Sequence, residues 1–196
     1  MAFNIQEFAD NIGRFGTSPV NRFEVFIPLP IIFQSPQVSY DAETSELLTF
    51  RAERVNIPGI VLDTYDTRRY GVGPQIRTAT GTSKFNEISV DFIDTSEMTI
   101  KRFFYDWMSN IVDIGGLPYP TFLSGYKADY CTDMTIRAYN SLGESVFNLD
   151  IIQAFPVSMT DNELAWSRTN ELFKTSVIFA YTNHQPRAGA VEVEIQ

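Results

Sequence analysis

The chain has 196 residues, of which 44% are hydrophobic, and its formal net charge is −9. The length and hydrophobic content predict a single domain over 1–196 with a sizeable core. The acidic balance excludes proteins that hold DNA or RNA by neutralising phosphates, and the lone cysteine excludes an internal disulfide. Without a long apolar run or a signal-peptide pattern, we expect neither a membrane anchor nor export.

Strands are predicted wherever apolar and polar residues alternate. The ranges with this pattern are 21–27, 47–52, 87–93, 128–139, 144–154, 157–159 and 172–181. Prolines between the first two strands predict a long loop insertion at 28–45, and 183–196 is predicted as a C-terminal extension. Pro156 is expected to bend the chain. Short strands joined by turns are typical of an antiparallel sandwich or barrel.

The segment at about 60–80 differs from the other strand-like stretches. Its two arms are β-prone and polar, and a glycine-containing tip at 70–74 separates them. Because the arms offer little apolar surface to bury, we expect a long hairpin that protrudes from the core.

One helix is predicted at about 95–113. Apolar residues recur along it at helical spacing, at Ile100, Phe103, Phe104, Trp107, Met108 and Ile111. Asp94 is expected to cap the first turn, with Glu97 in the capping-box position, and Gly115 and Gly116 end the helix. The helix must pack against strands. The predicted fold class is therefore mainly β, an antiparallel β-sandwich or barrel with one packed helix and a protruding hairpin.

Patterns for catalysis or metal binding are weak. Cys131 and the only histidine, His184, could form a nucleophile–base pair, but no motif surrounds them, and an inert thiol and a solvent or interface histidine are the favoured interpretation. Carboxylates recur at Asp41, Glu43 and Glu46, and again at Asp161 and Glu163. The first group lacks the spacing of a calcium loop, and nothing indicates a pocket around the second. We expect no catalytic residue, metal or cofactor.

Nine short stretches form an ordered set along the chain. They are FEVFI at 23–27, FRA at 50–52, VNIPGI at 55–60, ISVDF at 88–92, RFFYDW at 102–107, YKADY at 126–130, AFP at 154–156, LAW at 164–166 and the closing strand at 173–181. They cover most of residues 20–182. In this order and spacing, the chain resembles the tail tube proteins of contractile-tailed bacteriophages, which are related to the tubes of phage-like bacteriocins and of type VI secretion.

The resemblance implies a structural virion protein and not an enzyme. Family members form hexameric rings that stack into a hollow tube, with the sheets of neighbouring subunits joined edge to edge around a lumen. The implied partners are further copies of the chain, the tail sheath protein, the baseplate, and the tape-measure protein and viral DNA, which occupy the lumen without specific binding. The implied location is the tail of the virion, after assembly in the host cytoplasm.

We expect the hairpin to reach an adjacent subunit or ring through charged and aromatic side chains. These are Tyr65, Arg68, Arg69, Tyr70 and Arg77. In an otherwise acidic chain, such a basic cluster would meet acidic surface on its neighbour. An alternative with the same fold is a tube initiator or terminator, or a baseplate component, which the additions at 28–45 and 183–196 would suit. A third hypothesis is a hydrolase of the host envelope, with Asp161 and Glu163 as candidates.

Overall fold

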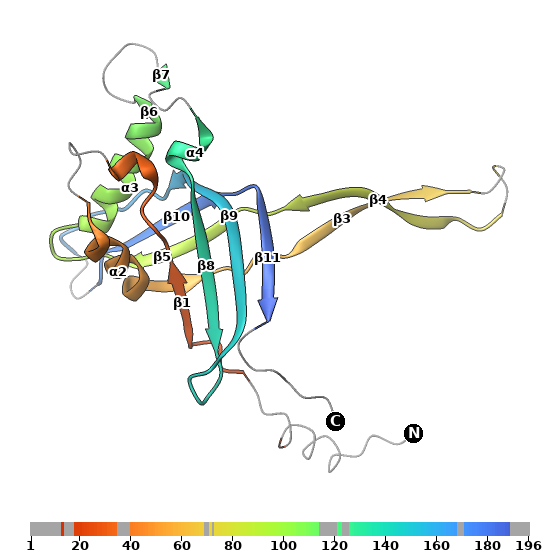
Figure 1. Cartoon of the computed structure of the whole chain (residues 1–196), viewed down its shortest axis with the longest axis horizontal. Coiled ribbons are helices and arrows are strands. Elements are labelled where there is room, and N and C mark those ends of the chain that lie inside the picture. Colours follow the sequence, from red (N-terminus) through yellow and green to blue (C-terminus); the bar gives the residue numbers. More distant parts are fainter. Residues whose placement is uncertain are drawn as a thin grey trace.

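Two antiparallel layers of strands face each other across one hydrophobic core in the computed structural model, which describes residues 13, 18–34, 40–68, 71, 73–113, 121–122, 126–167 and 171–188. In the first layer the order is β1 (Phe23–Phe26), β8 (Thr132–Tyr139), β9 (Ser145–Met159) and β11 (Asn183–Ala188). In the second layer the order is the last part of β9, then β10 (Lys174–Ala180), β5 (Ile88–Ile93) and β2 (Ala52–Val55). Helices gather at one end of the molecule (Figure 1).

Strand β9 belongs to both layers. Up to Ala154 it pairs with β8, and from Phe155 to Met159 it pairs with β10. The change of layer comes at Gln153, whose φ of 56° lies in the left-handed region and whose N–H donates to Asp133 Oδ1 at 2.8 Å. The bend predicted at Phe155–Pro156 comes slightly earlier, at the change of layer between Gln153 and Phe155, and Pro156 itself lies inside β9 opposite Phe179.

The predicted hairpin is confirmed and is longer than expected. It consists of β3 (Ile60–Thr67) and β4 (Ile76–Phe85), which continue β2 and β5 and project far from the body (Figure 1). Gly71 and Gly73, near the tip, have φ of 72° and 106°, a conformation that glycine adopts without strain. Among the described residues, β3 and β4 pair with each other alone.

The predicted helix is confirmed as α3 (Thr99–Ile111), and its apolar stripe fills the core. Its buried members are Ile100, Phe103, Phe104, Trp107 and Ile111. Phe104 packs against Phe92 of β5 and Phe179 of β10, with ring centroids 5.3 and 5.7 Å away. The Trp107 Nε1–H donates to the Tyr130 carbonyl at 2.8 Å. The mainly β fold with α3 packed on its layers is thus confirmed, but α3 is not the one packed helix that the sequence predicted, because α2 (Ala42–Arg51) packs on the strands as well.

The helix begins later than predicted, but Asp94 still caps it. Its carboxylate accepts the N–H groups of Ile100 and Lys101, both at 3.0 Å. The predicted capping box with Glu97 is wrong, because the Asp94 N–H donates instead to the Phe173 carbonyl at 2.9 Å. Asp94 therefore links the end of β5 and the approach to β10 to the start of α3.

A second helix replaces one predicted strand. The range 47–52 lies mostly in α2 (Ala42–Arg51), which packs beside β1, and Ser45 Oγ of this helix donates to the Ile27 carbonyl at 2.7 Å. The range predicted as a loop at 28–45 contains the 3-10 helix η1 (Ile31–Gln34) and the start of α2.

The remaining elements are short, and the C-terminal range holds one more strand. The short elements are α4 (Lys127–Tyr130), β6 (Val112–Asp113) and β7 (Thr121–Phe122). The first residues of the predicted extension at 183–196 form β11, paired with β9, so they belong to the first layer. No helix in the described part of the chain has the length and apolar character needed to cross a membrane.

Candidate assembly surfaces

The first layer has two open edges. Within the described ranges, β1 pairs with β8 alone and β11 pairs with β9 alone. The outer edge of β1, beside which α2 packs, therefore presents backbone N–H and C=O groups that no described strand pairs. The outer edge of β11 does so as well, except at Pro186, which has no N–H, and at His184, whose N–H donates to Asn183 Oδ1 at 2.8 Å. Exposed edges of this kind are templates for another strand. The layer can be extended on both sides by further copies of itself.

The face of this layer that points away from the core is polar, and its charges are largely paired. Arg137 of β8 lies 3.5 Å from the carboxylate of Glu24 on β1, and Tyr139 donates its hydroxyl to the same carboxylate at 2.5 Å. This hydrogen bond, together with burial and the charge of Glu24, raises the pKa of Tyr139, against the opposing effect of Arg137. On the other side of the layer, Arg187 of β11 lies 2.5 Å from Asp150 of β9. The face thus presents a hydrogen-bonded network with little uncompensated charge.

The hairpin carries the residues predicted to contact a neighbour, but the structure does not bring them into one cluster. Tyr65 lies opposite Thr78, and Arg77 lies opposite Asp66, so Tyr65 and Arg77 are on different faces of the hairpin. Arg77 Nε is 3.3 Å from Asp66 Oδ1, which offsets its charge. Arg68 is exposed beyond the end of β3. Arg69 and Tyr70 lie outside the described residues.

The arms also carry apolar side chains that the sequence reading missed. They are Ile60, Val61, Leu62 and Ile76, all of them exposed. The expectation that the arms lack apolar bulk is wrong, because these residues have no layer of this chain to pack against. A signal was present, since isoleucine, valine and leucine follow one another at 60–62. A two-stranded hairpin with exposed apolar residues is typical of an element that is buried by a partner.

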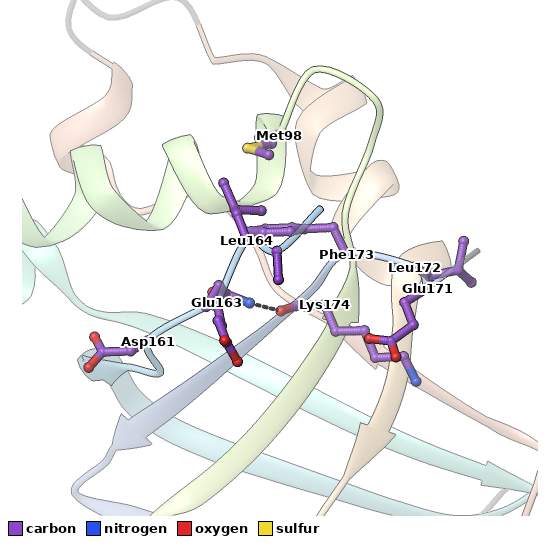
Figure 2. A pocket seen from close by; sticks show the side chains of 10 residues that line it. Met98, Asp161, Glu163, Leu164, Glu171, Leu172, Phe173 and Lys174 are labelled. Atoms are coloured by element: carbon purple, nitrogen blue, oxygen red, sulfur yellow. Dashed lines mark hydrogen bonds between the residues drawn. The ribbon is translucent and has the colours of Figure 1, made fainter. Parts of the chain in front are cut away.

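A groove of about 750 Å³ lies beside the connection between β9 and β10 (Figure 2). Its lining includes Met98, Leu164, Leu172 and Phe173. The carboxylates of Asp161 and Glu163 lie on one side of the groove and that of Glu171 on the other (Figure 2). These carboxylates thus lie on a partly apolar surface loop, whereas the sequence indicated no pocket around Asp161 and Glu163.

Cys131 and His184, the candidate nucleophile and base, lie in different surroundings. Cys131 is buried between α4 and β8, and burial, partly opposed by Lys127 and reinforced by Asp133, raises the pKa of its thiol above the ordinary value. The ring of His184 packs instead against Phe85 at the base of the hairpin, with ring centroids 4.9 Å apart. No group of three or more His, Cys, Asp or Glu side chains that could hold a metal occurs among the described residues.

The sequence of this chain matches the sequence model of one protein family. The family is the phage tail tube protein family, and the match spans residues 18–187, which include both strand layers, the hairpin and α3. The chain belongs to the phage tail tube protein family. No curated protein matches it.

Solved structures share the fold of this tail tube protein at low sequence identity. A chain from an extracellular contractile injection system, in a PVC sheath–tube complex in the extended state, has 19% identity and a TM-score of 0.59 over 91% of this chain and 97% of its own. A chain from the baseplate of the anti-feeding prophage has 11% identity and a TM-score of 0.58 over 88% and 97%. A chain from the tube-terminating cap of that prophage has 16% identity and a TM-score of 0.57 over 88% and 91%.

Proposed function

We propose that this tail tube protein forms hexameric rings that stack into the hollow tube of a contractile particle. Family membership supports a tube protein, and the fold shared with a chain of a sheath–tube complex supports a contractile particle. The observation that carries the proposal is the pair of open edges, β1 and β11, on one four-stranded layer.

Edge pairing explains how such a ring would close. Joining the β11 edge of one copy to the β1 edge of the next extends the same layer around a circle. This contact is heterologous, since each copy uses two different edges, and a heterologous contact generates a closed ring when its rotation closes. Ring closure pairs both outer edges of the first layer, which removes the exposed edges that this layer presents in a lone subunit.

The polar face of the first layer is the face that we expect to line the lumen. Its acidic side chains are engaged, as Glu24 is with Arg137 and Asp150 with Arg187, and the wall offers few free cations to a polyanion. Phosphate binding by proteins depends on Lys and Arg that neutralise phosphates. Viral DNA and the tape-measure protein would therefore pass this wall without specific binding.

The remaining parts of the proposal concern partners, location and chemistry. We expect the sheath protein around the tube and the baseplate at its end, because the related folds come from a sheath–tube complex and a baseplate. We expect the protein in the virion tail after assembly in the host cytoplasm, and we expect it to act by assembly and not by catalysis.

Negative-stain electron microscopy of the purified protein tests the proposal. Rings of uniform diameter with sixfold symmetry, and tubes at higher concentration, are the expected result. A protein that stays monomeric at high concentration would contradict ring formation.

A tube initiator, terminator or baseplate component is the second candidate, because similar folds occur in the baseplate and the cap of the anti-feeding prophage. Such a protein would form single rings that do not stack. Tubes many rings long, grown from the purified protein alone, would exclude this candidate. Sixfold rings that never stack at any concentration would favour it over the repeated tube subunit.

A further inference from the structure

The groove beside the β9–β10 connection has the character of a protein docking site. Three large apolar side chains of the connection point into solvent: Leu164 is 76% exposed, Trp166 is fully exposed and Leu172 is 67% exposed. Exposed tryptophan is rare on a surface that stays in water, and tryptophan is enriched among residues that carry binding energy at interfaces. This connection therefore presents more apolar surface than a solvated loop needs.

The connection is held in place at both ends. Thr160 N–H donates to the Ser176 carbonyl at 2.9 Å, and the Asn162 side chain bonds to the Lys174 carbonyl (Figure 2). The Lys101 ammonium of α3 donates to Asn162 Oδ1 at 3.0 Å and lies 5.3 Å from the centre of the Phe173 ring. These contacts fix the shape of the groove before a partner arrives, which reduces the entropy that binding must overcome.

Charge points to the hairpin as the occupant. The charged residues that line the groove are Asp161, Glu163, Glu171 and Lys174, three acidic and one basic. The hairpin range 60–85 has four basic and two acidic residues in a chain of net charge −9. Surfaces of opposite charge favour encounter and fix orientation. The hairpin also offers apolar side chains without a partner, among them Ile60, Leu62 and Ile76. It thus matches the groove in both charge and apolar character.

A hairpin cannot reach the groove of its own chain. The hairpin enters β5 at Ile88, and the other end of β5, Ile93, pairs with Lys174 at the end of the connection. The two surfaces therefore lie at opposite ends of one strand. Each arm extends over 8 to 10 residues, about 26–33 Å at 3.3 Å per residue, which exceeds the width of a four-stranded layer, about 15 Å. A hairpin of this length can cross to another copy.

We propose that the groove beside the β9–β10 connection receives the β3–β4 hairpin of a neighbouring copy. Leu164 and Leu172 of its lining, and the fully exposed Trp166 that follows the lining residue Ala165, are the main apolar contacts. The inference rests on the proposed assembly and adds the surfaces that meet in it. The contact is heterologous, because one copy gives the hairpin and the next gives the groove, and it therefore repeats along an assembly.

Site-specific photocrosslinking in the assembled full-length protein tests this pairing. A benzophenone amino acid replaces Trp166, and the control carries it at Tyr126, an exposed aromatic residue at the start of α4. Irradiated assemblies should give covalent dimers from position 166, with adducts mapped by mass spectrometry to 60–85. Assemblies whose adducts from position 166 lie elsewhere, or that give none, would overturn the pairing and leave the proposed function standing. A protein that forms no assembly would overturn the proposed function itself.

A second measurement does not depend on the crosslinker. Trp166→Ala and Leu172→Ala should raise the concentration needed for tube growth, by about tenfold for the tryptophan, because truncating an anchor residue at an interface has effects of this size. Leu142→Ala is the matched control, since Leu142 is 81% exposed in the turn between β8 and β9. All three side chains are exposed, so thermal unfolding of the subunit should not change. Equal tube growth by the Trp166 variant and the wild type would overturn the inference.

Discussion

Asp94 caps α3 from a buried position, and we expect its removal to cost more stability than the removal of a helix cap at the surface. Asp94→Ala tests this expectation. Asp94 is 7% exposed. Its Oδ1 accepts the N–H groups of Thr95 at 2.8 Å and Ile100 at 3.0 Å, and its Oδ2 accepts the N–H of Lys101 at 3.0 Å and the hydroxyl of Thr175 at 3.2 Å. One carboxylate thus satisfies donors on α3, on β10 and on the segment between β5 and α3.

The size of the effect follows from these bonds. A hydrogen bond to a charged group contributes about 1.5–3 kcal/mol net, and a buried donor left without a partner costs about 1–3 kcal/mol. The carboxylate also lies at the positive end of the α3 dipole, which adds up to about 2 kcal/mol in a partly buried site. Since these contributions are not additive, we expect Asp94→Ala to lower the free energy of unfolding by about 3–4 kcal/mol. That is a large part of the stability of about 5–15 kcal/mol typical of a domain.

Urea denaturation of the unassembled protein, followed by circular dichroism, measures this loss. Asp41→Ala is the matched control, because Asp41 also caps a helix but is exposed and accepts one N–H, from Thr44 at 3.4 Å. We expect this control to lose about 0.5 kcal/mol. Asp94→Asn keeps one oxygen acceptor and should fall between the two. Equal losses for Asp94→Ala and Asp41→Ala would refute the assignment of Asp94 as the main cap of α3.

Two further predictions use aromatic residues as probes. Trp107 is fully buried and Trp166 fully exposed. Acrylamide should therefore quench Trp107→Phe strongly, because this variant keeps Trp166, and quench Trp166→Phe little, because it keeps Trp107. Similar quenching of both variants would contradict the placement of the two residues. Burial, followed by the 2.6 Å hydrogen bond to Asp106 and the charge of that carboxylate, raises the pKa of Tyr40 despite Arg102. The neutral phenol is therefore favoured in the folded state, so its contribution to stability is complete below the pKa of the unfolded chain and is lost as the pH rises toward the folded pKa. Absorbance titration should show this tyrosine ionising above the ordinary tyrosine pKa, and Asp106→Asn should lower its pKa. An unchanged titration in that variant would refute the coupling.

The features that sequence could predict are those with a long, repeated pattern. The stripe of α3 runs over three turns, and each of Phe103, Phe104 and Trp107 is buried as its spacing indicated. The hairpin was predictable because two β-prone arms flank a glycine-containing tip. The position of Asp94 was informative even though the helix begins at Thr99, because a side chain can cap a helix across an intervening turn.

The prediction from sequence was wrong where a short pattern fits both a strand and a helix. Leu48, Phe50 and Ala52 alternate as in a strand, yet in α2 Leu48 is buried and Phe50 is exposed. The signal that distinguishes helix from strand here is Asp41, a good N-cap followed by strong helix formers, with Arg51 in the last turn. The path of β9 through Pro156 was not readable, since it depends on pairing with β10, which is distant in sequence.

The assembly surfaces were the hardest part to read from sequence, for a physical reason. Arg77 reads as a free cation, but its partner Asp66 lies across the hairpin, and only the register of β3 with β4 reveals the pair. In the same way Leu164 and Leu172 look like residues that a core would absorb. Their exposure is a consequence of tertiary structure, because the core beneath them is already filled by α3 and the strand layers.

The surfaces that a single copy leaves incomplete fall into two independent kinds. Among the described strands, β1 and β11 each lack a partner strand on the outer side, whereas the hairpin and the groove beside the β9–β10 connection lack apolar partners. One heterologous contact closes a ring and then has no free end, so it cannot also lengthen the assembly. Growth into a tube requires a second contact, on surfaces that ring closure leaves open. Since edge pairing uses the first layer, and the hairpin and groove extend from the second, the fold supplies both contacts without competition between them.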